Sequence, residues 1–238
     1  MSSEREHLKR RQLRALARQY QRKGYRVVAN PDRSEADRRN DVRRKPVEML
    51  SFIGVRPGMV VLDLFAGGGY TSELLARAVA PSGRVYAQMP RPPGATLAAR
   101  LKTPAAARIV SVAQPFESPA PTDVGAGGFD LVTLMFNYHD FGAMGVDRAR
   151  VNAAVFAALK SGGLYVIADH AGRPGTGISE SGTLHRVEES LVRREVEAAG
   201  FRLAAVGDFL RNPADPRDRE EPDPPQPKDE FVLKFVRP

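Results

Sequence analysis

One apolar run that ends in three glycines limits what this chain can fold into more than any other stretch. Residues 59–64 are apolar except for Asp63, as in a buried strand that contains a single acid. The chain then continues through Phe65, Ala66, Gly67, Gly68 and Gly69. Consecutive glycines let the backbone turn sharply at the end of a strand and approach a ligand closely. The stretch predicts a strand, a tight turn and a helix, with a ligand at the turn.

The residues around the turn favour some ligands over others. Gly69 is followed by Tyr70 and Thr71, so the Lys and the Ser or Thr of a phosphate-binding P-loop are missing. A nicotinamide site is disfavoured as well, because the last glycine of the GxGxxG pattern is absent and no acid ends the strand expected at 84–88. Asp63 suits a cation, such as the ammonium group of an amino-acid cofactor, better than a pyrophosphate.

The remaining chain alternates between strand and helix patterns. Helices are expected at 46–54, 92–102, 148–160 and 184–199, and strands at 84–88, 108–113, 129–136, 164–169, 201–209 and 230–236. The last two strands have no helix between them, which suggests one antiparallel strand. The predicted fold class is α/β, a Rossmann-like doubly wound and mostly parallel sheet with a terminal antiparallel strand.

Basic charge is concentrated at the beginning of the chain. Residues 1–26 contain nine Lys or Arg and two Glu, while the remaining residues contain 27 basic and 26 acidic side chains. We expect a basic helical extension over 1–29, with a helix at 3–22 and an extended link at 25–29, followed by one domain over 30–238. The extension could contact nucleic acid or another polyanion, or dock on the domain or on a second subunit as an amphipathic helix.

Composition also bounds the compartment and the chemistry. The chain has no cysteine, which excludes disulfides, thiolate metal sites and cysteine nucleophiles. No run approaches the roughly 20 apolar residues of a membrane span, and the first 26 residues lack an apolar export core. These features predict a cytoplasmic protein that does not enter a membrane.

Three of the four histidines follow the predicted strands at 129–136 and 164–169. They are His139, His170 and His185, each with an acid nearby in sequence, such as Asp140 and Asp169. Ligands of such sheets bind at the carboxyl ends of strands, so these side chains are candidates for proton transfer or substrate binding. They could also form structural hydrogen bonds. Metal binding is the least favoured reading, because no HxH or HxxxH spacing presets the ligands, and we expect no metal site.

Several motifs resemble those of the class I S-adenosylmethionine-dependent methyltransferases, and more narrowly a bacterial group of predicted members. Asp63 with Gly67 and Gly69 resembles their motif I, in which Phe65 replaces the first glycine. The narrower group is suggested by Arg44-Lys45-Pro46, by Asn137-Tyr138-His139-Asp140, by Asp169-His170 and by Leu184-His185-Arg186. The resemblance covers residues 30–238. It implies S-adenosylmethionine as cofactor, held by Asp63, Phe65, Ala66, Gly67, Gly68, Gly69, Gln88 and Met89, although Gln88 and Met89 stand where the family usually has an acid for the ribose.

The resemblance implies an in-line methyl transfer to an unidentified acceptor, which we expect to be a small molecule. His139 or His170 would remove a proton where the acceptor needs it, with Asp140 beside them, and Tyr138 would line the gap between methyl donor and acceptor. Arg173 and His185 are candidates for substrate binding around the glycine-rich loop 171–182. Two alternatives remain: a nucleic-acid methyltransferase tethered by the basic extension, and a cofactor-binding scaffold without activity.

Overall fold

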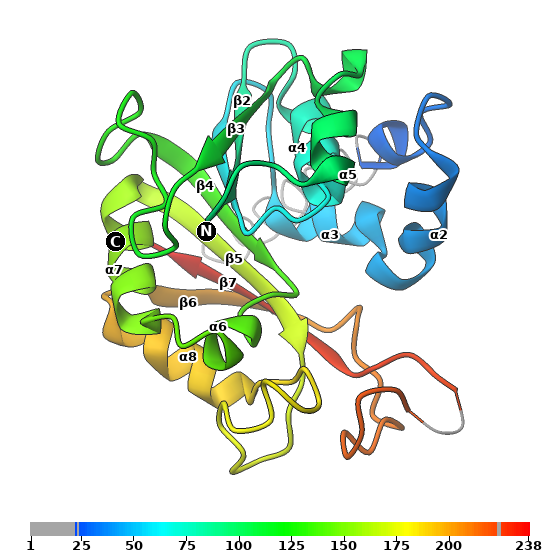
Figure 1. The fold of residues 1–238 in the computed structure, drawn as a ribbon, viewed down its shortest axis with the longest axis vertical. Helices are drawn as coiled ribbons and strands as arrows, with labels where there is room; N and C mark the ends of the chain where they lie inside the picture. Colours follow the sequence, from blue (N-terminus) through cyan, green and yellow to red (C-terminus); the bar gives the residue numbers. More distant parts are fainter. Residues whose placement is uncertain (1–21, 23, 223–224) are drawn as a thin grey trace, which may run out of the picture.

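A seven-stranded sheet forms the centre of the computed structural model, which describes residues 22, 24–222 and 225–238 (Figure 1). The strands are β1 (Val60–Leu64), β2 (Arg84–Met89), β3 (Ile109–Ala113), β4 (Phe129–Met135), β5 (Leu159–His170), β6 (Arg202–Gly207) and β7 (Glu230–Val236). Their spatial order is β3-β2-β1-β4-β5-β7-β6. Strands β1 to β5 pair in parallel, and β7 is antiparallel to both β5 and β6. The predicted fold class is confirmed.

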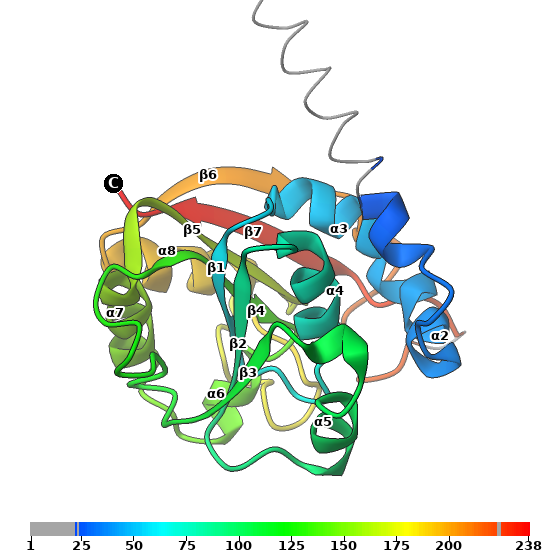
Figure 2. The same ribbon diagram turned by 90° about the horizontal axis from the view of Figure 1, so that it is seen from above.

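Helices cover both faces of this sheet. They are α2 (Glu35–Arg44), α3 (Pro46–Ile53), α4 (Tyr70–Val79), α5 (Ala95–Arg100), α6 (Asp140–Ala143), α7 (Arg148–Ala158) and α8 (Glu189–Ala198), with a short 3-10 turn, η1 (Pro104–Ala106). Apolar residues of α3, α4 and α5 share one core with the sheet, and those of α6, α7 and α8 share a second core on its other face (Figure 2). Neighbouring residues of β1 divide between them, with Val61 in the first core and Leu62 in the second.

The end of the basic extension differs from the prediction. Residues 24–28 are helical rather than extended, so Gly24 does not end a helix there. Val27 is 8% exposed and belongs to the core shared with α3 and α4, which explains why this turn is ordered against the domain. The helix predicted at 3–22 lies outside the described residues apart from its last position, and the division into 1–29 and 30–238 stays a prediction.

The helix predicted at 184–199 begins five residues later, at Glu189. Before it, Val187 donates a backbone hydrogen bond to the His170 oxygen at 3.1 Å and accepts one from Gly172 at 2.8 Å. His185 has a φ of 51°, which a helix does not permit. The predicted start of this helix was wrong, because pairing with the end of β5 overrides the local helical pattern, whereas the helix itself is confirmed over Glu189–Ala198.

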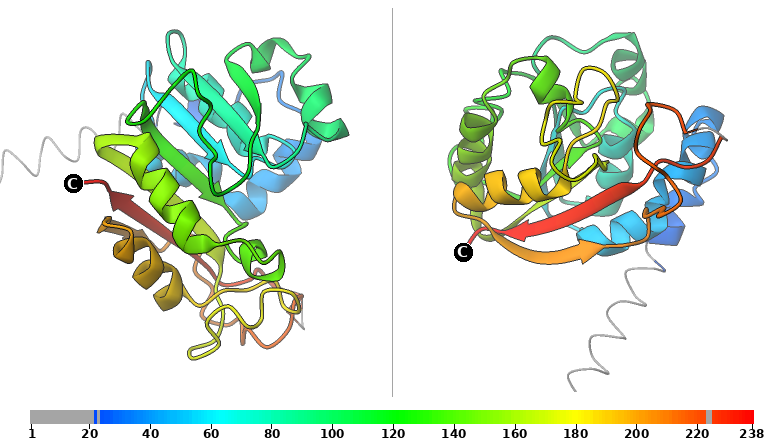
Figure 3. Two further views of the ribbon diagram at one scale, coloured as in Figure 1. Left: turned by 60° about the vertical axis from the view of Figure 1, so that its left-hand side comes forward. Right: turned by 90° about the horizontal axis from the view of Figure 1, so that it is seen from below.

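Two long loops meet beyond the carboxyl end of β5. Figure 3 shows the loop after β5 beside the loop between β6 and β7. Arg186 joins them, because its guanidinium lies 2.9 Å from Asp215 and donates to the carbonyl oxygens of Ala171 and Arg219. The side chains of Arg186 and Asp215 are both 0% exposed. In the part of the chain that the structure describes, no helix has both the length and the apolar character to cross a membrane.

Replacing Asp215 tests this connection. The change Asp215→Ala leaves the Arg186 guanidinium buried without its partner, so we expect the free energy of unfolding to fall by about 3–5 kcal/mol. Urea denaturation followed by circular dichroism measures it. The matched control is Glu197→Ala, which removes an exposed pair with Arg193 and should cost about 0.5 kcal/mol or less. Equal losses in the two variants would contradict the structural role of the buried pair.

Candidate functional site

The glycine turn lies where the sequence places it, between β1 and α4. Gly67 and Gly69 have φ values of 57° and 79°, and Gly69 caps α4. A Cβ atom on Gly69 would come within 2.8 Å of Leu97, whereas one on Gly67 would meet nothing within 4 Å. The turn is therefore tightly packed at Gly69 and open at Gly67, as a close approach by a ligand requires.

Phe65 takes the backbone conformation that a glycine would adopt easily. Its φ is 56°, which lies in the left-handed region. The N–H of the next residue, Ala66, donates a hydrogen bond to the backbone carbonyl oxygen of Gln88 at 2.9 Å. The Phe65 ring packs on Phe116 and Phe141, with centroids 4.7 and 6.1 Å away. These two rings belong to the core on the α6 side. Phe65 thus replaces a glycine without covering the open position at Gly67.

Asp63 is buried beneath the turn, with 1% of its surface exposed. One carboxylate oxygen accepts a hydrogen bond from the Ser72 hydroxyl at 2.5 Å and the other accepts one from the Thr133 hydroxyl at 2.7 Å. Burial raises the pKa of Asp63 to about 6 against these hydrogen bonds. Asp63 therefore connects β1 to α4 and β4, and its predicted contact with a ligand ammonium stays a prediction.

Gln88 and Met89 support the turn from the end of β2. The Gln88 side chain is fully buried; its Oε1 accepts from the Phe65 N–H at 3.1 Å and its Nε2 donates to the Gln114 carbonyl at 2.6 Å. The Met89 sulfur lies 3.2 Å from the Gly67 nitrogen. Since the Gln88 amide is engaged by backbone on both sides, this arrangement does not favour the predicted ribose contact.

Arg44, at the end of α2, is a site residue that sequence reasoning missed. Its guanidinium lies over the rings of Tyr70 and Phe136, 5.2 and 4.6 Å from their centroids. Burial lowers its pKa to about 10, partly offset by the charge of Asp63, and its buried Nε has no hydrogen-bond partner. A buried donor without a partner is costly, so this atom is suited to an acceptor on a ligand. The only sequence signal was its position in Arg44-Lys45-Pro46, one of the motifs of the family resemblance.

Helix α2 is connected to the glycine turn by one ion pair and one hydrogen bond. Asp41 accepts two hydrogen bonds from Arg33 and a third from the Tyr70 hydroxyl at 2.6 Å. Asp37 pairs with Arg100 at 2.8 Å, and the Arg100 Nε donates to the Gly68 carbonyl at 2.9 Å. The polar residues 35–44 lack an apolar stripe, which is why the sequence did not predict this helix or its contacts.

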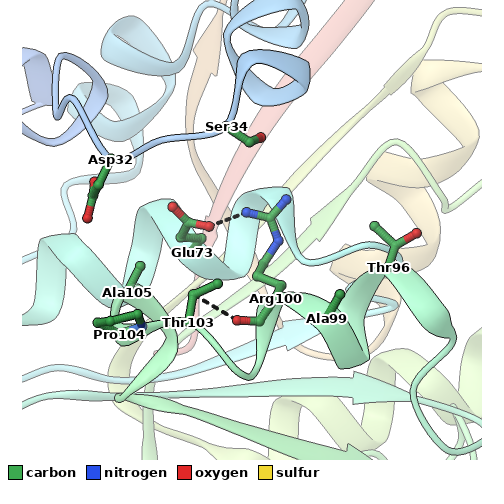
Figure 4. A pocket seen from close by; sticks show the side chains of 9 residues that line it. All are labelled: Asp32, Ser34, Glu73, Thr96, Ala99, Arg100, Thr103, Pro104 and Ala105. Atoms are coloured by element: carbon green, nitrogen blue, oxygen red, sulfur yellow. Dashed lines mark hydrogen bonds and ion pairs between the residues drawn. The ribbon is translucent and has the colours of Figure 1, made fainter.

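Arg100 also pairs with Glu73 across a pocket of about 470 Å³ between α4 and α5 (Figure 4). Asp32 and Ser34, from the segment before α2, lie on the opposite side of this pocket from the end of η1 (Figure 4). None of the site residues predicted from the sequence lines it. The pocket therefore lies beside the glycine turn and is separate from the predicted site.

The predicted histidines converge at the ends of β4 and β5. The His139 Nδ1 lies 2.7 Å from Asp169 and its Nε2 lies 3.2 Å from Asp140. Burial favours the neutral ring, but hydrogen bonds to Asp140 and Asp169 outweigh it and raise the pKa of His139 to about 10. In this arrangement His139 holds its proton at neutral pH, which does not favour it as a general base.

His170 and His185 lie on either side of His139, with ring centroids 5.6 and 5.5 Å from it. The buried His170 Nδ1 is 3.0 Å from a Glu230 oxygen but outside hydrogen-bonding geometry, and Glu230 also pairs with Arg43. The His185 side chain is 44% exposed and faces Asp140 through its Nδ1 at 3.8 Å. The structure thus brings together His139, Asp140, His170 and His185, as the sequence suggested.

Tyr138 and Arg173 both have partners within the protein. Tyr138 is fully buried; its hydroxyl donates to Glu195 of α8 at 2.7 Å and accepts from Asn152 of α7 at 3.0 Å. These bonds direct the hydroxyl between α7 and α8, and the predicted place of Tyr138 beside the methyl acceptor stays a prediction. Arg173 is exposed and pairs with Glu180 of its own loop. Substrate binding by Arg173 stays a prediction.

Comparisons with known proteins agree on the fold. No protein-family model matches the chain. The protein-L-isoaspartate O-methyltransferase of Aeropyrum pernix is 56% identical over 39 residues, which span only 16% of this chain and 15% of that protein. A solved S-adenosylmethionine-dependent methyltransferase from Aquifex aeolicus has a TM-score of 0.59 at 17% identity, over 86% of this chain and 99% of that one. A putative methyltransferase from Bacillus halodurans has a TM-score of 0.59 at 15% identity, over 80% and 97%.

The chain therefore has the fold of the class I S-adenosylmethionine-dependent methyltransferases. This confirms the broader part of the resemblance found in the sequence. The narrower bacterial group stays a prediction, because neither of these structures shares more than 17% of its residues with the chain.

The raised pKa of Asp63 predicts a pH dependence of stability. Its pKa of about 6 in the folded protein exceeds the ordinary value of 3.8, so the folded state binds this proton more tightly than the unfolded state. Ionising Asp63 therefore costs stability as the pH rises from about 4 to above 6, by up to about 3 kcal/mol. Asp63→Asn should remove that cost. Urea denaturation at several pH values should show that the free energy of unfolding of the variant, relative to that of the wild type, increases as the pH rises across this window. A difference that does not change with pH would contradict the raised pKa of Asp63.

Proposed function

We propose that this protein is an S-adenosylmethionine-dependent methyltransferase. The main support is the open position at Gly67, at the carboxyl end of β1, in a fold shared with solved methyltransferases. Ligands of open α/β sheets bind outside these strand ends. When bound, this cofactor supplies a methyl group already activated by a sulfonium charge, so the protein's main task is to position the acceptor.

The unpaired Nε of Arg44 supports this choice of cofactor. An amino-acid end carries a carboxylate that can accept a charge-assisted hydrogen bond from the guanidinium. The adjacent Asp63 carboxylate gives the same region a negative charge, which suits the ammonium group. Arg44 and Asp63 thus offer opposite charges to the two ends of a zwitterion.

The acceptor would lie over the ends of β4 and β5, and we propose that it is a small molecule. His139 contacts both Asp140 and Asp169, and because its pKa is raised, its ring keeps its proton and acts as a hydrogen-bond donor. His170 is then the remaining predicted candidate to remove a proton from the acceptor. The loops on either side of Arg186 would exclude water from the acceptor.

The open glycine provides a direct test. In Gly67→Ala the added methyl group occupies the space that the ligand needs, so we expect the affinity for S-adenosylmethionine to fall by about tenfold or more, which is about 1.4 kcal/mol. Isothermal titration calorimetry measures it. The matched control is Gly162→Ala, because Gly162 also has a left-handed φ and open space around it. It lies near the amino end of β5, away from the carboxyl ends of the strands where the ligand is proposed to bind. Similar affinities in both variants, or no binding by the wild type, would contradict the proposal.

Arg44 provides an independent test of the cofactor's orientation. Arg44→Gln removes the charge facing the proposed carboxylate, and we expect binding of S-adenosylmethionine to weaken by about 10- to 100-fold, which corresponds to one charge-assisted hydrogen bond. Arg39→Gln, on the same helix but exposed and paired with Glu35, should bind normally. Equal weakening in both variants would point to a general effect of charge on α2 and would exclude the specific contact.

A further inference from the structure

Three side chains near the proposed acceptor position form a cluster with metal-ligating chemistry. Ligand atoms of His139, Asp140 and His185 all lie within 4.8 Å of one another. His139 and Asp140 follow β4, whereas His185 belongs to the segment that pairs with the end of β5. The sequence spacing between these residues does not reveal the cluster, because the fold brings His185 to the other two.

The distances suit a transition-metal ion. A tetrahedral ion bonded at about 2.0–2.1 Å keeps its ligand atoms roughly 3.3 Å apart. The Asp140 Oδ1 lies 3.2 Å from the His139 Nε2 and 3.8 Å from the His185 Nδ1. His185 is partly exposed, so a small rotation of its ring can close the remaining gap.

An acid holds the His139 ring nitrogen that faces away from the cluster. Asp169 lies 2.7 Å from the His139 Nδ1, whereas Glu220, at 3.8 Å from the His185 Nε2, is beyond hydrogen-bond distance. The second oxygen of Asp140 accepts from the Asn137 amide at 2.9 Å. Histidine ligands of metals typically have such a partner, which fixes the orientation of the ring and makes the free nitrogen a better ligand.

We propose that His139, Asp140 and His185 bind a divalent transition-metal ion such as Zn²⁺, which releases to solvent the proton that the His139 Nε2 carries in the metal-free protein. Two imidazoles and one carboxylate favour this class of ion over Mg²⁺ or Ca²⁺, which prefer oxygen ligands. Three protein ligands leave a fourth position for water or for an atom of the acceptor. This proposal departs from the expectation from the sequence that the protein has no metal site. The proposal stands on these side chains alone and does not depend on methyl transfer.

The test is calorimetry with ZnCl₂ after the full-length protein has been treated with EDTA. The wild type should bind one Zn²⁺ per chain, and Mg²⁺ in excess should not compete. We expect His185→Ala to weaken Zn²⁺ binding by about 100-fold or more, and Asp140→Asn to weaken it by about 10-fold or more. Thermal unfolding of each variant checks that it remains folded.

The matched control is His170→Ala, because the His170 ring lies beside His139 but is not a proposed ligand. Its folded form should bind Zn²⁺ like the wild type. The proposal is overturned if the wild type binds no Zn²⁺, if His185→Ala binds it with full affinity, or if His170→Ala loses it. A parallel titration of the wild type with S-adenosylmethionine separates the metal proposal from the proposed methyltransferase function. If the wild type does not bind S-adenosylmethionine, the methyltransferase proposal is contradicted and the Zn²⁺ proposal is unaffected.

Discussion

The buried carboxylate of Asp169 connects the strand ends on which the histidine cluster depends. It accepts hydrogen bonds from the His139 ring at 2.7 Å, from the His139 backbone N–H at 2.8 Å and from the His170 N–H at 2.7 Å. A buried carboxylate requires such donors, because leaving its charge unpaired is costly. These three hydrogen bonds to Asp169 fix where the chain leaves β4 relative to the end of β5. His139, His170 and the start of α6 then have little freedom in how they face the site.

Segments that are distant in the sequence enclose both the proposed cofactor position at the glycine turn and the proposed acceptor position at the ends of β4 and β5. Helix α2 is held against the glycine turn by the ion pair of Asp37 with Arg100 and by the hydrogen bond from the Tyr70 hydroxyl to Asp41, so Arg44 reaches the rings of Tyr70 and Phe136. On the acceptor side, the buried pair of Arg186 with Asp215 joins the loops beyond β5. Each connection uses charges that are largely removed from water, where breaking one partner is expensive. The proposed cofactor and acceptor positions are therefore built from rigid supports rather than from free loops.

Much of the fold could be predicted because its signals are local. The apolar run into Gly67 predicted β1, the turn and the start of α4, and the absence of a helix before Glu230 predicted the antiparallel strand β7. The errors arose where tertiary contacts compete with local pattern. Residues 184–188 have a helical pattern, yet Arg186 is drawn into a buried ion pair and Val187 pairs with β5. Helix α2 was missed because ion pairs, rather than an apolar stripe, attach it to the domain.

The sequence by itself determined the alternation of strands and helices, the glycine turn and the set of histidines near the strand ends, because periodicity and backbone freedom act over a few residues. Only the tertiary structure decided what each side chain meets there. In the folded protein, the Gln88 amide and the Tyr138 hydroxyl have hydrogen-bond partners within the chain, whereas the Arg44 Nε has none. The fold also places His185 next to His139 and Asp140. Hydrogen-bond partners depend on residues far apart in the chain, and their directions follow from packing that no local pattern contains.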